Sequence, residues 1–351
     1  WKSLLASVKI DFAYRTFKWS NEAKGKAAVH CVIIGFSAKS LTPVRFIIDG
    51  EDRTEVKNIN PYLVNAPDVL MTSQKAPVCD APKMSYGSMP IDEGALILSE
   101  EEKTQLESAD QKAMKFLRKY IGGEELINNR VRWCLWLKDA SSSEMRASKF
   151  ILARIDRCKK FRSQSNRPQT KELAGTSHLF GEIRQPDSTM LVLPKVSSEN
   201  RNYLPIGFVS PEVIVNGSAL IVPDASTYHF GILSSSVHNH WMRAICGRMK
   251  SDYQYSIHIV YNNFPWPEAT DQQKTAIEKA AKAVLTVREK SPDSNLADLY
   301  DPRTMPPELL KAHKTLDKVV MQAYGFSLKA SEAEIVAALM ERYQALIGKG
   351  G

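Results

Sequence analysis

Pro265 and Pro267 mark the point at which the composition of this sequence changes. Proline lacks a backbone N–H and does not fit the interior of a helix, so no regular helix runs through this pair. Before it, residues 178–227 alternate short apolar runs with proline and glycine, which predicts a compact unit of short strands. After it, glycine is rare and Ala, Lys, Glu and Leu dominate, which predicts helices. We expect these helices at residues 268–290, 306–325 and 331–347, with Pro306-Pro307 opening the second and Ser331 capping the third.

The first 50 residues contain two apolar runs, at residues 27–36 and 44–48. Both are apolar and β-branched nearly throughout, as in strands that are buried on both faces of an α/β sheet. Phe17 and Trp19 precede them in a polar segment that we expect to be a loop. Aromatic rings beside a sheet edge can stack on a nucleic-acid base. Equally, the two rings can form a small core beneath the loop.

A helix is predicted to begin at Ser99, because Glu102 three residues later completes a capping box. We expect this helix to reach about Tyr120 and a strand to follow at residues 131–137. Asp68, Glu101 and Lys103 also fit the Pro-Asp and acid-x-Lys pattern of metal-dependent nucleases. The capping role explains these glutamates better, so a nuclease is the lesser alternative.

The strongest charge feature is residues 144–171, with nine Lys and Arg against two acidic residues. Apolar residues recur there at helical spacing, which predicts an amphipathic helix with a cationic face that ends before Pro168. Cations that touch DNA phosphates release counterions and give affinity without sequence information. The alternative is an ordinary solvated helix face. The candidates for phosphate contact are Arg146, Lys149, Arg154, Arg157, Lys160 and Arg162.

Residues 228–267 are rich in polar and aromatic side chains that suit the reading of base edges. The serines at 234–236 can cap a helix that we expect to extend to about Arg248, and residues 257–261 are expected to form a strand. Asn and Gln pair with adenine, Arg and Lys with guanine, and Asp with cytosine. Some of these residues can instead contact only phosphate. The candidates for base reading are His238, Asn239, Arg243, Arg248, Lys250, Asp252 and Gln254.

Composition limits the remaining classes of function. The net charge of +8 favours nucleic acid or acidic partners, and five scattered cysteines indicate a reducing, cytoplasmic compartment instead of a disulfide framework. The sequence has no run long enough for a membrane helix, no glycine-rich phosphate loop and no metal-ligand spacing. We therefore assign no catalytic residue and no metal ligand. Because the sequence starts at Trp1 and soon becomes strand-rich, we expect it to be part of a longer chain.

Several long blocks carry a family resemblance, among them FAYRTFKWSNEAKGKAAVHCVIIGFS, LFGEIRQPDS, VSSENRNYLPIGF, CGRMKSDYQYS and LADLYDPRTMPPELLKAH. They resemble the C-terminal part of the MmeI-like type II restriction and modification enzymes, in which one polypeptide carries a nuclease, an adenine methyltransferase and a target recognition domain. The resemblance implies methyltransferase strands at 1–55, the target recognition domain at 56–267 and a helical C-terminal segment at 268–351. It also implies that the catalytic motifs, the S-adenosylmethionine site and the magnesium-dependent nuclease lie upstream. By position in this family, Trp19, or secondly Phe17, is expected to stack on the target base.

Together these observations predict an α+β fold, in which a β-rich recognition domain with long helices follows the last strands of an α/β methyltransferase. The leading hypothesis is sequence-specific recognition of double-stranded DNA, with the upstream domains as partners in the same polypeptide. The alternatives are a stand-alone nuclease that uses Asp68, Glu101 and Lys103, and a protein-interaction scaffold that does not touch DNA.

Overall fold

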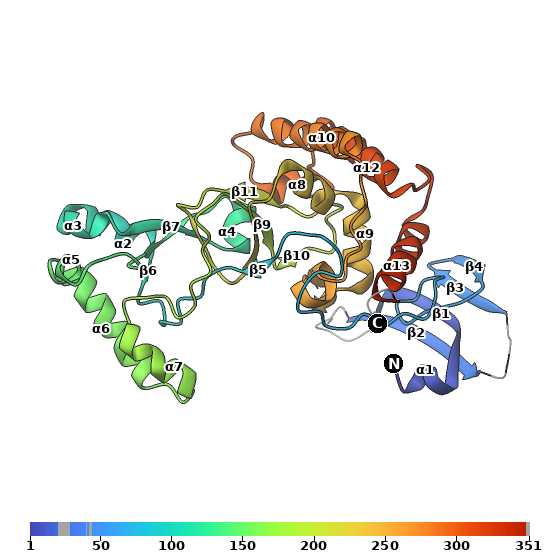
Figure 1. Ribbon diagram of the computed structural model, residues 1–351, viewed down its shortest axis with the longest axis horizontal. Helices are drawn as coiled ribbons and strands as arrows, with labels where there is room; N and C mark the ends of the chain where they lie inside the picture. Colours follow the sequence, from blue (N-terminus) through green and yellow to red (C-terminus); the bar gives the residue numbers. More distant parts are fainter. Residues whose placement is uncertain (20–28, 40, 42–43, 349–351) are drawn as a thin grey trace.

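The computed structural model describes residues 1–19, 29–39, 41 and 44–348. The molecule is elongated, with the N-terminal sheet at one end, a lobe of short strands and helices at the other, and a helix-covered body between them (Figure 1). We call the lobe that contains residues 92–180 the arm. The fold is α+β, as predicted.

The N-terminal sheet has the strand order β2-β1-β3-β4. After the short helix α1 (Leu4–Ser7), its strands are β1 (Val8–Trp19), β2 (Val29–Ala38), β3 (Arg45–Asp49) and β4 (Asp52–Val56). Ile10, Ala13 and Ile47 pack on Ile59 in a small core. However, Phe12, Val32, Ile33 and Phe36 are 40–51% exposed, so the expectation that these strands are buried on both faces is wrong for the described residues. The physical reason is that only part of this sheet is covered by the rest of the described chain.

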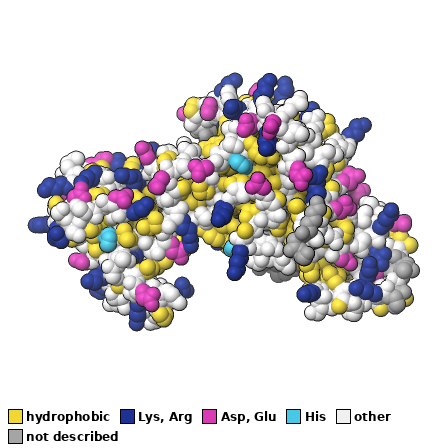
Figure 2. All heavy atoms as spheres, in the orientation of Figure 1, with side chains coloured by type: hydrophobic (Ala, Val, Ile, Leu, Met, Phe, Trp, Pro, Cys, Tyr) yellow, Lys and Arg dark blue, Asp and Glu magenta, His cyan; other side chains and the backbone are white. Residues whose placement is uncertain are grey.

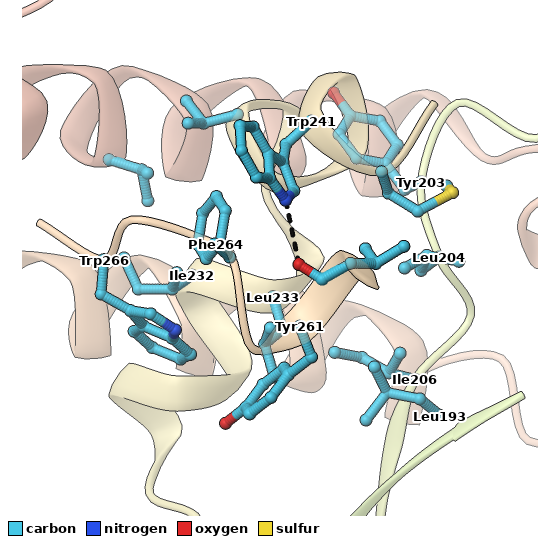
Figure 3. Packing of buried hydrophobic residues seen from close by; sticks show 14 of the residues in the cluster. Leu193, Tyr203, Leu204, Ile206, Ile232, Leu233, Trp241, Tyr261, Phe264 and Trp266 are labelled. Atoms are coloured by element: carbon cyan, nitrogen blue, oxygen red, sulfur yellow. Dashed lines mark hydrogen bonds between the residues drawn. The ribbon is translucent and has the colours of Figure 1, made fainter. Parts of the chain in front are cut away.

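The central body is built on the antiparallel sheet β11-β9-β13-β5. Its strands are β5 (Ser85–Tyr86), β9 (Met190–Pro194), β11 (Gly207–Val209) and β13 (Ala219–Pro223). Helices α8 (Thr227–Ser234) and α9 (Ser236–Ile245) lie on this body, and Ser235 caps α9 as expected. Figure 3 shows Trp241 of α9 in the core, where its indole N–H donates to the Val260 carbonyl at 3.0 Å.

A second, smaller sheet in the body has the order β10-β15-β14. It joins β10 (Val196–Ser197) to the hairpin formed by β14 (Gly247–Met249) and β15 (Asp252–Gln254). Helix α9 therefore ends at Ile245 and not near Arg248 as expected. Residues Ile257–Tyr261, which were predicted to be a strand, form a π-helical turn. The amides of Asn262 and Asn263 fix this turn by donating to the carbonyls of Gln74 and Thr72.

The arm contains the sheet β12-β7-β8-β6, with β6 (Ile97–Leu98), β7 (Leu117–Ile121), β8 (Arg132–Leu135) and β12 (Ile214–Val215). Its helices are α2 (Glu100–Ala109), α3 (Gln111–Met114), α4 (Gly123–Asn128), α5 (Ser142–Arg146), α6 (Lys149–Ser163), α7 (Pro168–Glu172) and the 3-10 turn Leu173–Thr176. The capping box of Ser99 and Glu102 is confirmed, but the helix stops at Ala109. Asp110 leaves helical geometry (φ −151°, ψ 82°), and Leu117–Ile121 joins the sheet instead of extending the helix to Tyr120.

The C-terminal helices α10 (Asp271–Glu289), α12 (Pro307–Tyr324) and α13 (Glu332–Gly348) agree with the three predicted segments, and the short helix α11 (Leu296–Leu299) was not predicted. Ser331 caps α13, where its hydroxyl accepts from the Glu334 N–H. These helices share one hydrophobic core with α8 and α9, so they cover the central body and do not form a separate tail. Across the described ranges, no helix is both long and apolar enough to cross a membrane.

Candidate nucleic-acid interface

The cationic segment 144–171 is three helices, α5, α6 and α7, and not one. Ser148 interrupts it with extended backbone geometry and caps α6 by accepting from the Ile151 N–H at 3.0 Å. Pro168, where a helix was expected to have ended, begins α7 because proline suits the first turn. Four of the six predicted phosphate contacts are exposed on the arm, namely Arg146, Lys149, Arg157 and Lys160. Figure 2 shows many lysine and arginine side chains gathered on this lobe.

The prediction that Arg162 contacts phosphate is wrong, because its side chain is fully buried. Its guanidinium donates to five backbone carbonyls, those of Pro90, Ile91, Leu173, Thr176 and Leu179, at 2.7–3.1 Å. Arg154 is also largely occupied by the protein: it pairs with Glu102 and donates to the Ala95 and Ile97 carbonyls. Both arginines therefore hold the arm together and are not available to phosphate.

His238 and Asn239, predicted to face the surface, lie in the core at 0% and 2% exposure. The two ring nitrogens of His238 lie 2.9 Å from the Leu233 carbonyl and from the Tyr255 hydroxyl. Burial lowers the pKa of His238 to about 4, so the ring is neutral at physiological pH. The Asn239 amide donates to the Ser235 carbonyl at 2.7 Å. The prediction that these two residues form a polar reading surface is wrong, because the helix is covered on both sides.

The remaining predicted readers lie on the hairpin Gly247–Gln254 or next to it. Met249 pairs with Asp252, which leaves Lys250 and Ser251 as the two-residue turn. Lys250 has a φ of 58° and is exposed at the tip, whereas Asp252 and Gln254 are half-buried on β15. The structure therefore brings Lys250, Asp252 and Gln254 together on one hairpin.

Arg243 and Arg248 line a cavity of about 520 Å³ at the base of this hairpin. Arg15, Tyr253 and Glu332 also line this space, which we call the junction cavity. Arg15 was not among the residues predicted from the sequence. The only signal for it is one positive charge in the middle of a strand rich in aromatic residues, FAYRTF.

Phe17 and Trp19 belong to strand β1 and not to a loop, which corrects the expectation. The pairing of β1 with β2 has a register irregularity between Tyr14 and Phe17. The centroids of the Tyr14 and Phe17 rings lie 5.2 Å apart in an edge-on contact. The side chain of Trp19 and residues 20–28 lie outside the described part of the chain.

The nuclease alternative requires Asp68, Glu101 and Lys103 in one site. Asp68 accepts from the Asn58 amide at 2.9 Å, whereas Lys103 forms ion pairs with Glu100 and Glu107 along α2. Among the residues that the structure describes, no three His, Cys, Asp or Glu side chains are grouped to hold a metal ion. The structure thus gives these residues local roles and does not assemble them.

Comparison with known proteins gives consistent matches along the chain. The model of the MmeI target recognition domain matches residues 65–268, that of the MmeI C-terminal domain residues 269–349, and that of the MmeI DNA-methyltransferase domain residues 1–48. DNA methyltransferase A of Bacillus subtilis (strain 168) is 37% identical over 98% of this chain, and the match covers 39% of that protein.

A solved structure of the type IIL restriction-modification enzyme MmeI in complex with DNA is 44% identical, with a TM-score of 0.91. It matches 99% of this chain, and this chain covers 47% of it. The chain thus spans less than half the length of both relatives. The resemblance found in the sequence is confirmed by these matches: the chain belongs to the MmeI family and carries its target recognition and C-terminal domains together with a segment of its methyltransferase domain.

Proposed function

We propose that this chain is the DNA-reading part of a restriction-modification enzyme and that it binds double-stranded DNA in a sequence-specific way. The observation that carries the proposal is that the backbone follows, over 99% of its length, that of a relative whose structure contains DNA. The charge distribution supports it, because the arm carries exposed cations and the hairpin presents base-pairing side chains. Figure 2 shows a hollow between the arm and the rest of the molecule, open to one side, in which a duplex can lie.

The exposure of the side chains indicates which of them contact phosphates and which contact bases. Arg146, Lys149, Arg157 and Lys160 hold no buried contacts that DNA would have to break. They are suited to phosphates, which position the duplex without reading it. Lys250 is exposed at the turn of a hairpin and Asp252 and Gln254 are half-buried on its second strand, and a two-stranded ribbon fits the major groove.

Replacing the four exposed arm cations together by glutamine is expected to weaken DNA binding on every sequence. Each phosphate contact that is lost reduces the slope of log K against log salt by roughly 0.9, so the slope should fall by up to about 3–4. The measurement is binding to duplex DNA between about 50 and 200 mM salt. A matched control replaces four exposed lysines at α10, namely Lys274, Lys279, Lys282 and Lys290. An equal loss of slope in both variants would move the phosphate contacts away from the arm.

Replacing Lys250 with alanine is expected to change base preference at one position of the recognised site. A good side-chain contact to a base edge gives roughly 1–3 kcal/mol of discrimination, so the preferred base pair there should lose most of its advantage. Affinity measured on duplexes that vary one position at a time reports this effect. If Lys250→Ala weakens binding equally on all of these duplexes, Lys250 contacts phosphate and does not read a base.

For the whole protein we propose adenine methylation with S-adenosylmethionine, in the cytoplasm, with methyltransferase and magnesium-dependent nuclease domains supplied by the same polypeptide. In that setting Trp19 or Phe17 stacks on the extruded adenine, which partly offsets the cost of unstacking it. The residues of this chain supply the recognition, and its domains are proposed to divide at about residues 55 and 267. The deciding experiment is to map methylated adenines in DNA from cells that carry the full-length gene. Absence of any sequence-specific methylation, together with absence of DNA binding, would favour the scaffold alternative.

A further inference from the structure

The junction cavity lies where three separate parts of the chain meet. Arg15 and Asp49 come from the N-terminal sheet, Arg243 and Arg248 from the end of α9 and the hairpin, and Glu332 from the start of α13. These segments fall in the stretches matched by the methyltransferase, target recognition and C-terminal domain models, apart from Asp49, which directly follows the first of them. A ligand in this cavity would therefore touch groups from all three.

Two guanidinium groups flank the ring of Tyr253 in this cavity. The guanidinium carbon of Arg248 lies 4.3 Å from the ring centroid and that of Arg243 lies 5.9 Å from it. Arg243 donates through one terminal nitrogen to the Arg201 carbonyl, but its buried Nε has no hydrogen-bond partner among the described residues. A buried donor without an acceptor is costly, and a small shift of the Arg243 side chain toward a ligand oxygen in the cavity would relieve that cost.

Arg15 reaches the same space from strand β1. It donates through two nitrogens to the Leu63 carbonyl and pairs with Asp49, all at 3.3 Å. Leu63 has a φ of 58°, an unusual conformation for leucine, and the buried Asn60 side chain holds this loop by accepting from the Tyr62 and Val64 N–H groups. The contacts of Arg15 are long and its partner Asp49 is 66% exposed, so a stronger acceptor can replace them.

Among the side chains that line the cavity, three arginines outnumber two carboxylates. Asp49 lies 3.3 Å from Arg15, and Glu332 lies 3.1 Å from a ring nitrogen of His240. Burial alone would raise the pKa of Glu332, but His240, Arg243 and Arg15 lower it overall. Arg248 has one further partner, Glu199 at 3.7 Å. Planar guanidinium groups match the oxygens of a phosphate, so a phosphodiester is the ligand that fits these donors.

We propose that the junction cavity binds one phosphodiester of the DNA backbone, next to the base pairs that the hairpin reads. The inference rests on the proposed function and names a contact on that same DNA. It assigns Arg243 and Arg248 to phosphate instead of to bases, and it adds Arg15 as a third donor from the methyltransferase segment. A single phosphate held from both sides fixes the distance between the recognised bases and the methyltransferase strands.

The test is a methylphosphonate scan, in which one phosphate at a time of the recognised duplex is made neutral. One such position is expected to reduce the affinity of the unmodified protein roughly tenfold, as expected when a charge-assisted hydrogen bond is lost. For Arg248→Gln and for Arg15→Gln, the affinity for this modified duplex should be no lower than the affinity of the same variant for unmodified DNA. Arg45→Gln is a matched control, because Arg45 lies in the same sheet and donates to the Ile10 and Lys57 carbonyls, but it does not line the cavity.

The outcomes separate the inference from the proposed function. A protein that does not bind duplex DNA at low salt contradicts both. A protein that binds DNA, but in which every neutral phosphate has the same effect on wild type, Arg15→Gln and Arg248→Gln, overturns the inference alone. If Arg15→Gln unfolds, Arg248→Gln decides, because the Arg248 side chain is 30% exposed and belongs to the hairpin surface.

Discussion

Replacing Arg162 with alanine is expected to lower the free energy of unfolding of the arm by about 3–5 kcal/mol, because it removes several charge-assisted hydrogen bonds to buried carbonyls and leaves a cavity. The guanidinium connects α6 to the segments at residues 90–91 and 173–179 through five carbonyl groups. Its loss leaves buried acceptors without donors and a space where the side chain was. Urea unfolding followed by circular dichroism measures the effect.

Arg157 provides the matched control on the same helix. Its side chain is exposed and donates to a single carbonyl, that of Glu93 at 3.1 Å. Arg157→Ala should change stability by no more than about 0.5 kcal/mol. Arg162→Ala should therefore change the free energy of unfolding, whereas Arg157→Ala should change the affinity for DNA. If Arg162→Ala left stability unchanged and reduced the salt slope of DNA binding, Arg162 would return to the group of phosphate contacts.

The elements that could be predicted are those set by local chemistry. Capping boxes at Ser99 and Ser331 fix helix starts through hydrogen bonds within a few residues. The pair Pro306-Pro307 fixes the start of α12 through the φ that proline imposes on the first turn. The end of α2 could not be read in the same way. Leu117–Ile121 is compatible with either structure, and it becomes a strand because it pairs with β8, a contact made at a distance along the chain.

The site was harder to predict because exposure depends on tertiary packing. Helix α9 carries polar residues on one side, yet α8, α12 and α13 all pack against it and bury His238 and Asn239. For Arg162 a signal did exist: it follows the buried Cys158 by four residues, so both point to the same, inward face of α6. The high density of charge in residues 144–171 made this four-residue spacing of Cys158 and Arg162 easy to overlook. The hairpin was missed because Gly247 and Arg248 were expected to continue α9, which is excluded only once the pairing of Met249 with Asp252 is known.

Acid is expected to destabilise the central body through two buried histidines. Burial lowers the pKa of His238 to about 4 and that of His313 to about 3, against an ordinary value of 6.5. Because the folded state holds both rings neutral while the unfolded state protonates them, their contribution to stability is complete above pH 6.5. It is lost progressively as the pH falls from 6.5 toward 4 for His238 and toward 3 for His313. Over its full window the loss should be about 3 kcal/mol for His238 and about 5 kcal/mol for His313.

The pH range in which the buried histidines lose their contribution to stability lies above that of the surface carboxylates, so the two contributions can be measured separately. The hydrogen bond from Lys115 lowers the pKa of Glu144 to about 2, and that from Arg303 does the same for Asp301. These groups lose their contribution only below their ordinary values of 4.5 and 3.8. The measurement is urea unfolding at a series of pH values between 7 and 4.5, where Glu144 and Asp301 keep their charge. Burial raises the pKa of Asp317, so this carboxyl gives a dependence of the opposite sign, and variants of the two histidines separate the two contributions.

His238→Gln and His313→Gln are the variants that test the assignment. Glutamine cannot be protonated, so each variant should be less stable at pH 7 but should lose less stability on acidification than the wild type. His238 is the more informative position, because its partners, the Leu233 carbonyl of α8 and the hydroxyl of Tyr255, show that the ring connects α9 to α8 and to the residue that follows the hairpin strand β15. A wild-type dependence on pH that persists in the double variant would mean that other groups bind the protons on unfolding. The slope of the free energy of unfolding against pH reports how many protons the chain binds on unfolding. If each substitution reduces that number by one, the neutral rings are part of what holds the hairpin Gly247–Gln254 in place.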